Sequence, residues 1–175
     1  MYLIAIDPSI NSMGWAVFNL ETLALEASGT TTNALWAKSK LSQSIRLASI
    51  MRNLEADISE WLNRSQILVI EQPQLFSSYK SMASTRSGSL LILHLLVGAL
   101  YWWGISHDQF DTSGTHLIPV STWKGQLPKH VTAMRMKRKY GIKSFETDDQ
   151  SDAIGLGDWY IVNRYGKGKE TEDKV

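Results

Sequence analysis

The chain contains no cysteine, and this absence excludes several kinds of chemistry. Disulfide scaffolds, cysteine-ligated zinc and thiol nucleophiles are ruled out, so a bound metal must be held by oxygen or imidazole ligands. A strong charge imbalance is also lacking, because 18 Lys and Arg face 17 Asp and Glu. Any electrostatic function must therefore come from local segregation of charge. The 175 residues, 43% of them hydrophobic, are enough for one domain and too few for two of usual size.

We expect no export, because the apolar start of the sequence meets Asp7 after six uncharged residues, unlike the pattern of a signal peptide. We therefore expect a cytoplasmic protein. The one stretch that suggests a membrane span is 87–106, which has no charged residue. Glycines and His94 interrupt it, and no cluster of Lys or Arg marks a flank. We favour a buried helix over a membrane span and expect no membrane partner.

Alternating apolar runs and helical periodicities predict an α/β fold. Three closely spaced strand-like runs, at 2–7, 14–20 and 23–28, predict an antiparallel meander. The remaining pattern predicts a helix over 39–63, a strand at 67–70, the helix at 87–106, a strand at 116–120, and helices at 128–141 and from Thr147 toward Arg164. This order predicts a mixed five-stranded sheet with helices on its faces. We expect a single domain over 1–165 and a flexible tail over 166–175.

Carboxylates follow two of the predicted strands. Asp7 ends the first strand and Glu71 follows the run 67–70, so parallel neighbours would bring both acids to one edge of the sheet. Asp149 and Asp152 lie three residues apart and share one face of the last helix. Four clustered carboxylates repel one another and need positive charge between them. Two Mg²⁺ ions about 4 Å apart would supply it and clamp the oxygens of a phosphodiester.

Some of these acids also have an interpretation without catalysis. Asp7 precedes Pro8 and has the character of a turn residue. Asp148 and Asp149 stand in the first turn of a helix, where the helix dipole favours acids whatever the function. Neither explanation applies to Asp152, which lies beyond that turn. The glycines at 155 and 157 suggest that this helix lies close against the sheet.

Basic residues are concentrated in 121–143, which has no acid. A solvated helix face is the simplest interpretation of such a run. Beside an acidic cluster it instead predicts a surface for nucleic-acid phosphates and a lysine that offsets charge at the scissile phosphate. We assign that role to Lys129, with Lys124 as the alternative. The candidate DNA-binding residues of this run are Lys124, Lys129, Arg135, Lys137 and Arg138.

A second candidate DNA-binding segment follows Glu71. Residues 72–89 contain no acid and carry Phe76, Tyr79, Lys80 and Arg86. Aromatic side chains stack on unpaired bases, and neighbouring cations bind the backbone. Anchoring of a loop to the core is an equally good explanation for the two aromatic residues.

Four motifs in order resemble those of the RuvC-type Holliday junction resolvases, within the ribonuclease H-like superfamily. They are 4–9 (IAIDPS) with Gly14, 69–72 (VIEQ), 119–124 (PVSTWK) and 149–153 (DQSDA). The resemblance spans nearly the whole chain, and the short length resembles phage-encoded members. It implies a ribonuclease H-like fold, a homodimer, Mg²⁺ or Mn²⁺ as cofactor, and a bacterial cell or a phage-infected host.

The resemblance also implies a reaction and a ligand set. The expected enzyme is a crossover junction endodeoxyribonuclease that resolves four-way DNA junctions by paired symmetric nicks, leaving 5′-phosphate and 3′-hydroxyl ends. By motif position, Asp7, Glu71, Asp149 and Asp152 are the expected metal ligands.

Two alternatives to a junction resolvase remain open. One is a ribonuclease H-like nuclease acting on other branched DNA or on RNA, and the other is a non-catalytic DNA-binding module with structural acids. An actin-like or sugar-kinase ATPase needs a second such half and glycine-rich phosphate loops, which this sequence lacks. We expect no organic cofactor.

Overall fold

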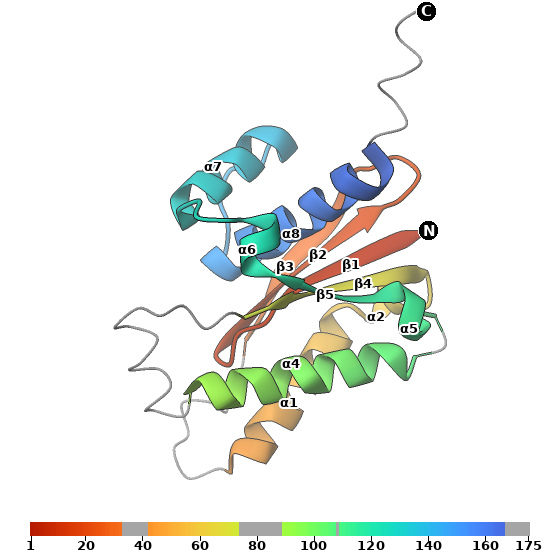
Figure 1. Ribbon diagram of the computed structural model, residues 1–175, viewed down its shortest axis with the longest axis vertical. Helices are drawn as coiled ribbons and strands as arrows, with labels where there is room; N and C mark the ends of the chain where they lie inside the picture. The colour runs from red at the N-terminus through yellow and green to blue at the C-terminus, as the bar shows by residue number, and fades with distance from the viewer. Residues whose placement is uncertain (33–41, 74–88, 108, 167–175) are drawn as a thin grey trace, which may run out of the picture.

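The computed structural model describes residues 1–32, 42–73, 89–107 and 109–166, which form a mixed sheet flanked by helices (Figure 1). The strands are β1 (Tyr2–Asp7), β2 (Ser12–Asn19), β3 (Leu25–Thr32), β4 (Ser65–Gln72) and β5 (Thr115–Pro119). Their order in the sheet is β3-β2-β1-β4-β5. β1, β2 and β3 pair antiparallel, whereas β1, β4 and β5 run parallel. The predicted mixed sheet with three antiparallel N-terminal strands is confirmed.

Helices cover both faces of the sheet, as predicted. They are α1 (Gln43–Asp57), α2 (Ser59–Leu62), α4 (Ser89–Ile105), α5 (Asp111–Gly114), α6 (Val120–Trp123), α7 (Lys129–Tyr140) and α8 (Asp148–Tyr165). In Figure 1, α1 and α4 lie on one side of the sheet and α7 and α8 on the other. Each side has its own buried apolar cluster, one including Ile50 and Leu96 and the other including Ile154.

The helical segment after β3 differs from the prediction. One helix was expected over 39–63, but the described part of that range forms two, α1 and α2, which meet at Ile58. The backbone of Ile58, with φ −103° and ψ 7°, departs from helical geometry. Its side chain is fully buried, so the apolar periodicity continues across the break and hides it from the sequence pattern. The four-residue helices α5 and α6 are too short to produce such a pattern.

The described part of the uncharged segment 87–106 contains α4, whose inner side is buried in the core through Ile92, Leu96 and Leu100. In the described ranges, none of the helices has both the length and the apolar character needed to cross a bilayer. The outer side of α4 exposes large apolar side chains, among them Leu91 and Trp102, the latter 69% exposed.

Glycines allow α8 to approach its neighbours closely. Gly14 pairs with Asp7 across β1 and β2, and a Cβ there would lie 1.9 Å from the backbone oxygen of Asp149. At Gly157 a Cβ would lie 2.3 Å from the Phe18 ring on β2, so its predicted approach to the sheet is confirmed. Gly155, on the same helix, faces the Trp123 ring on α6 and the Thr132 side chain on α7. This docking brings the first turn of α8 against the end of β1.

Candidate active site

Two carboxyl groups lie side by side at one edge of the sheet. β1 and β4 pair in parallel, with Ile6 opposite Ile70, so the next residues, Asp7 and Glu71, occupy neighbouring positions at the strand ends. The residues just before each acid are buried in both strands, so the acids lie next to the protein interior. Asp7 is only 7% exposed. Glu71 is half-buried beside it, and both carboxyl groups line the same cavity.

The first turn of α8 brings two more acids to this edge. The helix begins with Thr147, whose hydroxyl accepts a hydrogen bond from the backbone N–H of Gln150 at 3.2 Å. The Gln150 side chain in turn donates to Ser28 on β3, which ties the turn to the sheet. This placement of the helix start brings Asp149 and Asp152 to the cavity. The Ser12 hydroxyl donates to Asp149 Oδ2 at 2.6 Å.

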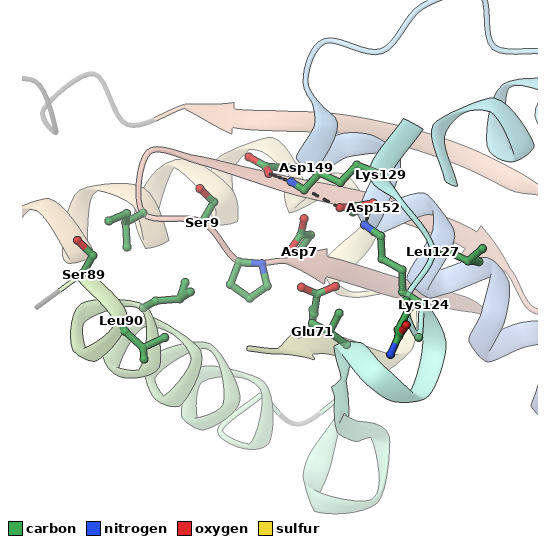
Figure 2. A pocket seen from close by; sticks show the side chains of 16 residues that line it. Asp7, Ser9, Glu71, Ser89, Leu90, Lys124, Leu127, Lys129, Asp149 and Asp152 are labelled. Atoms are coloured by element: carbon green, nitrogen blue, oxygen red, sulfur yellow. Dashed lines mark hydrogen bonds and ion pairs between the residues drawn. The ribbon is translucent and has the colours of Figure 1, made fainter. Parts of the chain in front are cut away.

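All four acids line one cavity of about 570 Å³. Figure 2 shows Asp7 and Glu71 facing this space from the strands, with Asp149 and Asp152 beside them. The opposite wall includes apolar side chains from the first turns of α4, such as Leu90 and Leu93. The structure thus brings together acids from three separate parts of the sequence. Asp148 is exposed and is not part of this lining.

Two lysines approach the acids in different ways. Lys124 Nζ lies 2.6 Å from Asp152 Oδ1, and the two side chains are only 8% and 4% exposed. Lys129 Nζ lies 3.7 Å from Asp152 Oδ2 and 3.9 Å from Asp149 Oδ1, and its side chain is 58% exposed. Lys124 is therefore the buried partner of one acid, whereas Lys129 stands at the mouth of the cavity.

The electrostatics of the site reflect crowding of negative charge. Burial raises the pKa of Asp7 well above its ordinary value, and the charges of Glu71, Asp152 and Asp149 raise it further. Burial and then Asp152 raise the pKa of Glu71. Burial alone disfavours the charged form of Lys129, but the surrounding acids outweigh it and raise the pKa of this lysine. The cavity therefore favours additional positive charge.

The cavity suits a hard divalent cation, because four carboxylates line it and such cations prefer oxygen ligands. The side chains are nevertheless engaged with one another. Within the described ranges, no three Asp, Glu or His side chains are grouped so that they could hold a metal ion as they stand. Lys124 binds Asp152, Ser12 binds Asp149, and the Trp123 indole binds Glu71. Coordination would require some of these bonds to be exchanged for metal contacts.

The predicted DNA-binding residues are only partly within the described structure. Arg135 and Arg138 are exposed on α7, and Lys137 lies half-buried with its Nζ 5.5 Å from the centre of the Phe145 ring. Lys124 and Lys129 line the acidic cavity. Phe76, Tyr79, Lys80 and Arg86 lie outside the described residues.

Two contacts at the site were not predicted from the sequence. Ser12 lies at the start of β2, and nothing in the sequence around it marks a partner 137 residues away. Trp123 belongs to the predicted PVSTWK motif, but its hydrogen bond to Glu71 spans 52 residues. Both become visible only when the sheet edge is assembled.

Comparison with known proteins identifies the fold. No family model matches the sequence, and no curated protein matches it. T. thermophilus RuvC in complex with a Holliday junction substrate superposes with a TM-score of 0.68 at 14% identity, covering 95% of this chain and 97% of that chain. A second structure, of Thermus thermophilus RuvC, gives a TM-score of 0.59 at 15% identity over the same shares. The chain therefore has the fold of the RuvC-type Holliday junction resolvases.

The fowlpox virus Holliday junction resolvase also matches, with a TM-score of 0.44 at 14% identity, covering 93% of this chain and 99% of that chain.

Proposed function

We propose that the protein is a divalent-metal-dependent endodeoxyribonuclease that cuts branched DNA, with four-way junctions as its main substrate. The observation that carries the proposal is the convergence of four carboxylates and two lysines on one cavity, at a sheet edge of a RuvC-type fold. The proposed reaction is attack of water on a phosphodiester, leaving 5′-phosphate and 3′-hydroxyl ends. Symmetric nicks in two strands then resolve the junction.

Asp7, Glu71, Asp149 and Asp152 are the proposed ligands of Mg²⁺ or Mn²⁺, two ions for each site. When bound, such ions supply a more nucleophilic water and stabilise negative charge on the phosphate and the departing oxygen. Asp7 lies close to the other acids, and the charges of all three raise its pKa. Burial raises the pKa of both Asp7 and Glu71, so a divalent cation competes with protons for these two carboxylates.

Lys129 is the better candidate for contact with the scissile phosphate. It is largely exposed at the cavity mouth, and the surrounding acids keep it protonated. Lys124 is buried against Asp152 and is already committed to that partner. A cation held beside the reacting phosphate offsets charge that develops during hydrolysis.

The basic side of α7 is the proposed surface for the DNA backbone. Arg135 and Arg138 are exposed there, and the segment around them contains no acid to compete for them. Lys137 adds charge to the same surface. Phe76, Tyr79, Lys80 and Arg86 remain candidates for contact with unpaired bases and the backbone. The Thermus RuvC of the same fold is known in complex with a Holliday junction substrate, which supports branched DNA as the ligand.

A homodimer is part of the proposal, because paired symmetric nicks call for two active sites related by a two-fold axis. The exposed apolar side of α4, with Leu91, Leu95 and Trp102, supports association of the chain with a second copy. We expect a two-subunit mass by light scattering at micromolar concentration. A single-subunit mass both with and without junction DNA contradicts this part of the proposal.

One observation favours a second candidate, a DNA-binding module without catalysis. Glu71, Asp149 and Asp152 each accept a hydrogen bond from another side chain, so the acids also have a purely structural explanation. A module of this kind binds junctions but cuts no strand at any concentration of Mg²⁺ or Mn²⁺.

The decisive experiment uses a labelled mobile four-way junction incubated with the protein and Mg²⁺. Linear duplex, a splayed fork and an RNA–DNA hybrid serve as parallel substrates, and EDTA as the metal-free control. We expect nicks at symmetric positions in two opposing junction strands, ligatable without further processing, and no cutting in EDTA.

Other outcomes reject the proposal in different ways. Cutting of the hybrid alone assigns the protein to nucleases of RNA. Cutting of forks and junctions alike assigns a general branch nuclease. Tight junction binding with no scission in either metal assigns the non-catalytic module.

A further inference from the structure

Trp123, at the end of α6, makes a direct contact with one of the site acids. Its indole N–H donates a hydrogen bond to Glu71 Oε2 at 2.9 Å. The bond is partly buried. The indole N–H can donate a hydrogen bond but cannot accept one, so the Glu71 oxygen must be the acceptor. One of the two Glu71 oxygens is therefore committed to the indole.

The rest of the indole is packed against α8. A Cβ at Gly155 would lie 2.8 Å from the ring, closer than side-chain contacts allow, so only glycine leaves room for it. Gly155 follows Asp152 by three residues and lies on the same side of α8. Glycine weakens a helix interior relative to alanine, and the space taken by the Trp123 ring, together with the Thr132 methyl group on its other neighbour α7, explains its presence here.

The next residue links the same ring to the opposite acid. Lys124 Nζ lies 5.3 Å from the centre of the Trp123 ring, within range of a cation–π interaction, and 2.6 Å from Asp152 Oδ1. Two consecutive residues thus contact an acid on β4 and an acid on α8. The end of α6 therefore connects the acid on β4 with the acid on α8.

We propose that Trp123 is a positioning residue for the metal-binding acids. Its N–H fixes the orientation of the Glu71 carboxylate, and its ring holds α8 at the distance that brings Asp152 beside Glu71. Because one Glu71 oxygen is occupied, the other is left to face the cation. This inference rests on the proposed function, since it assigns a role toward the divalent cation that the four acids would hold.

The test compares Trp123→Phe with the parent protein. Phenylalanine keeps an aromatic ring beside α8 and Lys124 but removes the N–H donor. Partners that orient metal ligands typically contribute 10–100-fold to metal affinity. We expect Mn²⁺ titrated calorimetrically into the protein without DNA to bind about tenfold or more weakly. The turnover rate on a junction falls with it at fixed Mn²⁺, while KM for the junction stays within about twofold, because no DNA contact is lost.

Trp159→Phe is the matched control. Trp159 lines a separate cavity of about 240 Å³ beside Trp123, and its side chain makes no hydrogen bond to the four acids. The Mn²⁺ affinity of Trp159→Phe is expected to equal that of the parent. This result would show that weaker binding in Trp123→Phe comes from the lost N–H donor, and not from loss of any nearby indole. A second variant, Trp123→Gln, restores an N–H donor and is expected to recover part of the Mn²⁺ affinity.

Two results overturn the inference while leaving the proposed nuclease intact. One is a Trp123→Phe protein that binds Mn²⁺ and cuts junctions like the parent. The other is equal loss of Mn²⁺ affinity in Trp123→Phe and Trp159→Phe. Failure of the parent protein itself to bind Mn²⁺ rejects the proposed function instead.

Discussion

Asp7→Asn is expected to abolish strand scission, by about 10³-fold or more, while junction binding in EDTA changes by less than about twofold. Asp7 lies among the other three acids, and the charges of all three raise its pKa in addition to burial. Asparagine keeps the shape of the side chain and removes the anion that a divalent cation requires. Single-turnover cleavage of a labelled junction measures the first effect, and a gel-shift titration measures the second.

The same substitution is expected to stabilise the metal-free protein at neutral pH. The pKa of Asp7 is raised by folding, so between its unfolded value, about 4, and the raised folded value the native state binds more protons than the unfolded chain. In that range the parent loses stability as the pH rises. Asp7→Asn removes this loss, so its melting temperature in EDTA exceeds that of the parent at pH 7, and the difference shrinks toward pH 4.

Adding Mg²⁺ extends the same comparison. A cation that binds only the folded state raises the melting temperature of the parent, and Asp7→Asn should lose most of that increase. Asp148→Asn is the matched control, because Asp148 is exposed in the same first turn of α8 and does not line the cavity. It is expected to cut junctions normally. If Asp7→Asn loses junction binding and junction cutting to the same extent, Asp7 is structural and the catalytic assignment is wrong.

Local patterns were sufficient to predict where β1 ends and where the last helix begins, whereas the third strand, predicted over 23–28, spans Leu25–Thr32. An apolar run followed by an acid predicts that Asp7 and Glu71 lie at a sheet edge. The parallel pairing of β1 and β4 places the two acids next to each other. Thr147 and Gln150 predict the start of α8, and the hydroxyl of Thr147 does accept from the Gln150 N–H. The Gln150 side chain differs from a capping box, since it bonds Glu146 and Ser28 rather than returning to Thr147.

Contacts between distant segments could not be predicted in this way. Lys124 stands in a basic run that indicates a solvated surface, yet it is buried against an acid 28 residues further along the chain. The cause is α6, whose four residues turn the chain across the sheet edge immediately after β5. A helix of one turn has no periodicity to detect, so the sequence alone does not distinguish Lys124 from Lys129.

Lys124→Met is expected to lower the free energy of unfolding by about 3–5 kcal/mol, because it leaves the buried Asp152 carboxylate without its partner. Methionine retains most of the volume of the lysine stem, so the lost ion pair dominates over lost packing. Urea unfolding followed by tryptophan fluorescence and circular dichroism measures the change. Lys129→Met is the control and should cost less than about 1 kcal/mol, since this side chain is 58% exposed and more than 3.5 Å from either acid.

A double-mutant cycle with Asp152→Asn isolates the pair. If the cost of Lys124→Met arises from an unpaired buried charge, then adding Asp152→Asn recovers most of the lost stability, giving a coupling of about 2 kcal/mol or more. Equal destabilisation by the two lysine substitutions, or additive effects in the cycle, contradicts the buried pair. The two lysines differ in role: Lys129→Met should keep its stability and lose junction cutting, because its ammonium is exposed at the cavity mouth, where it can meet a phosphate.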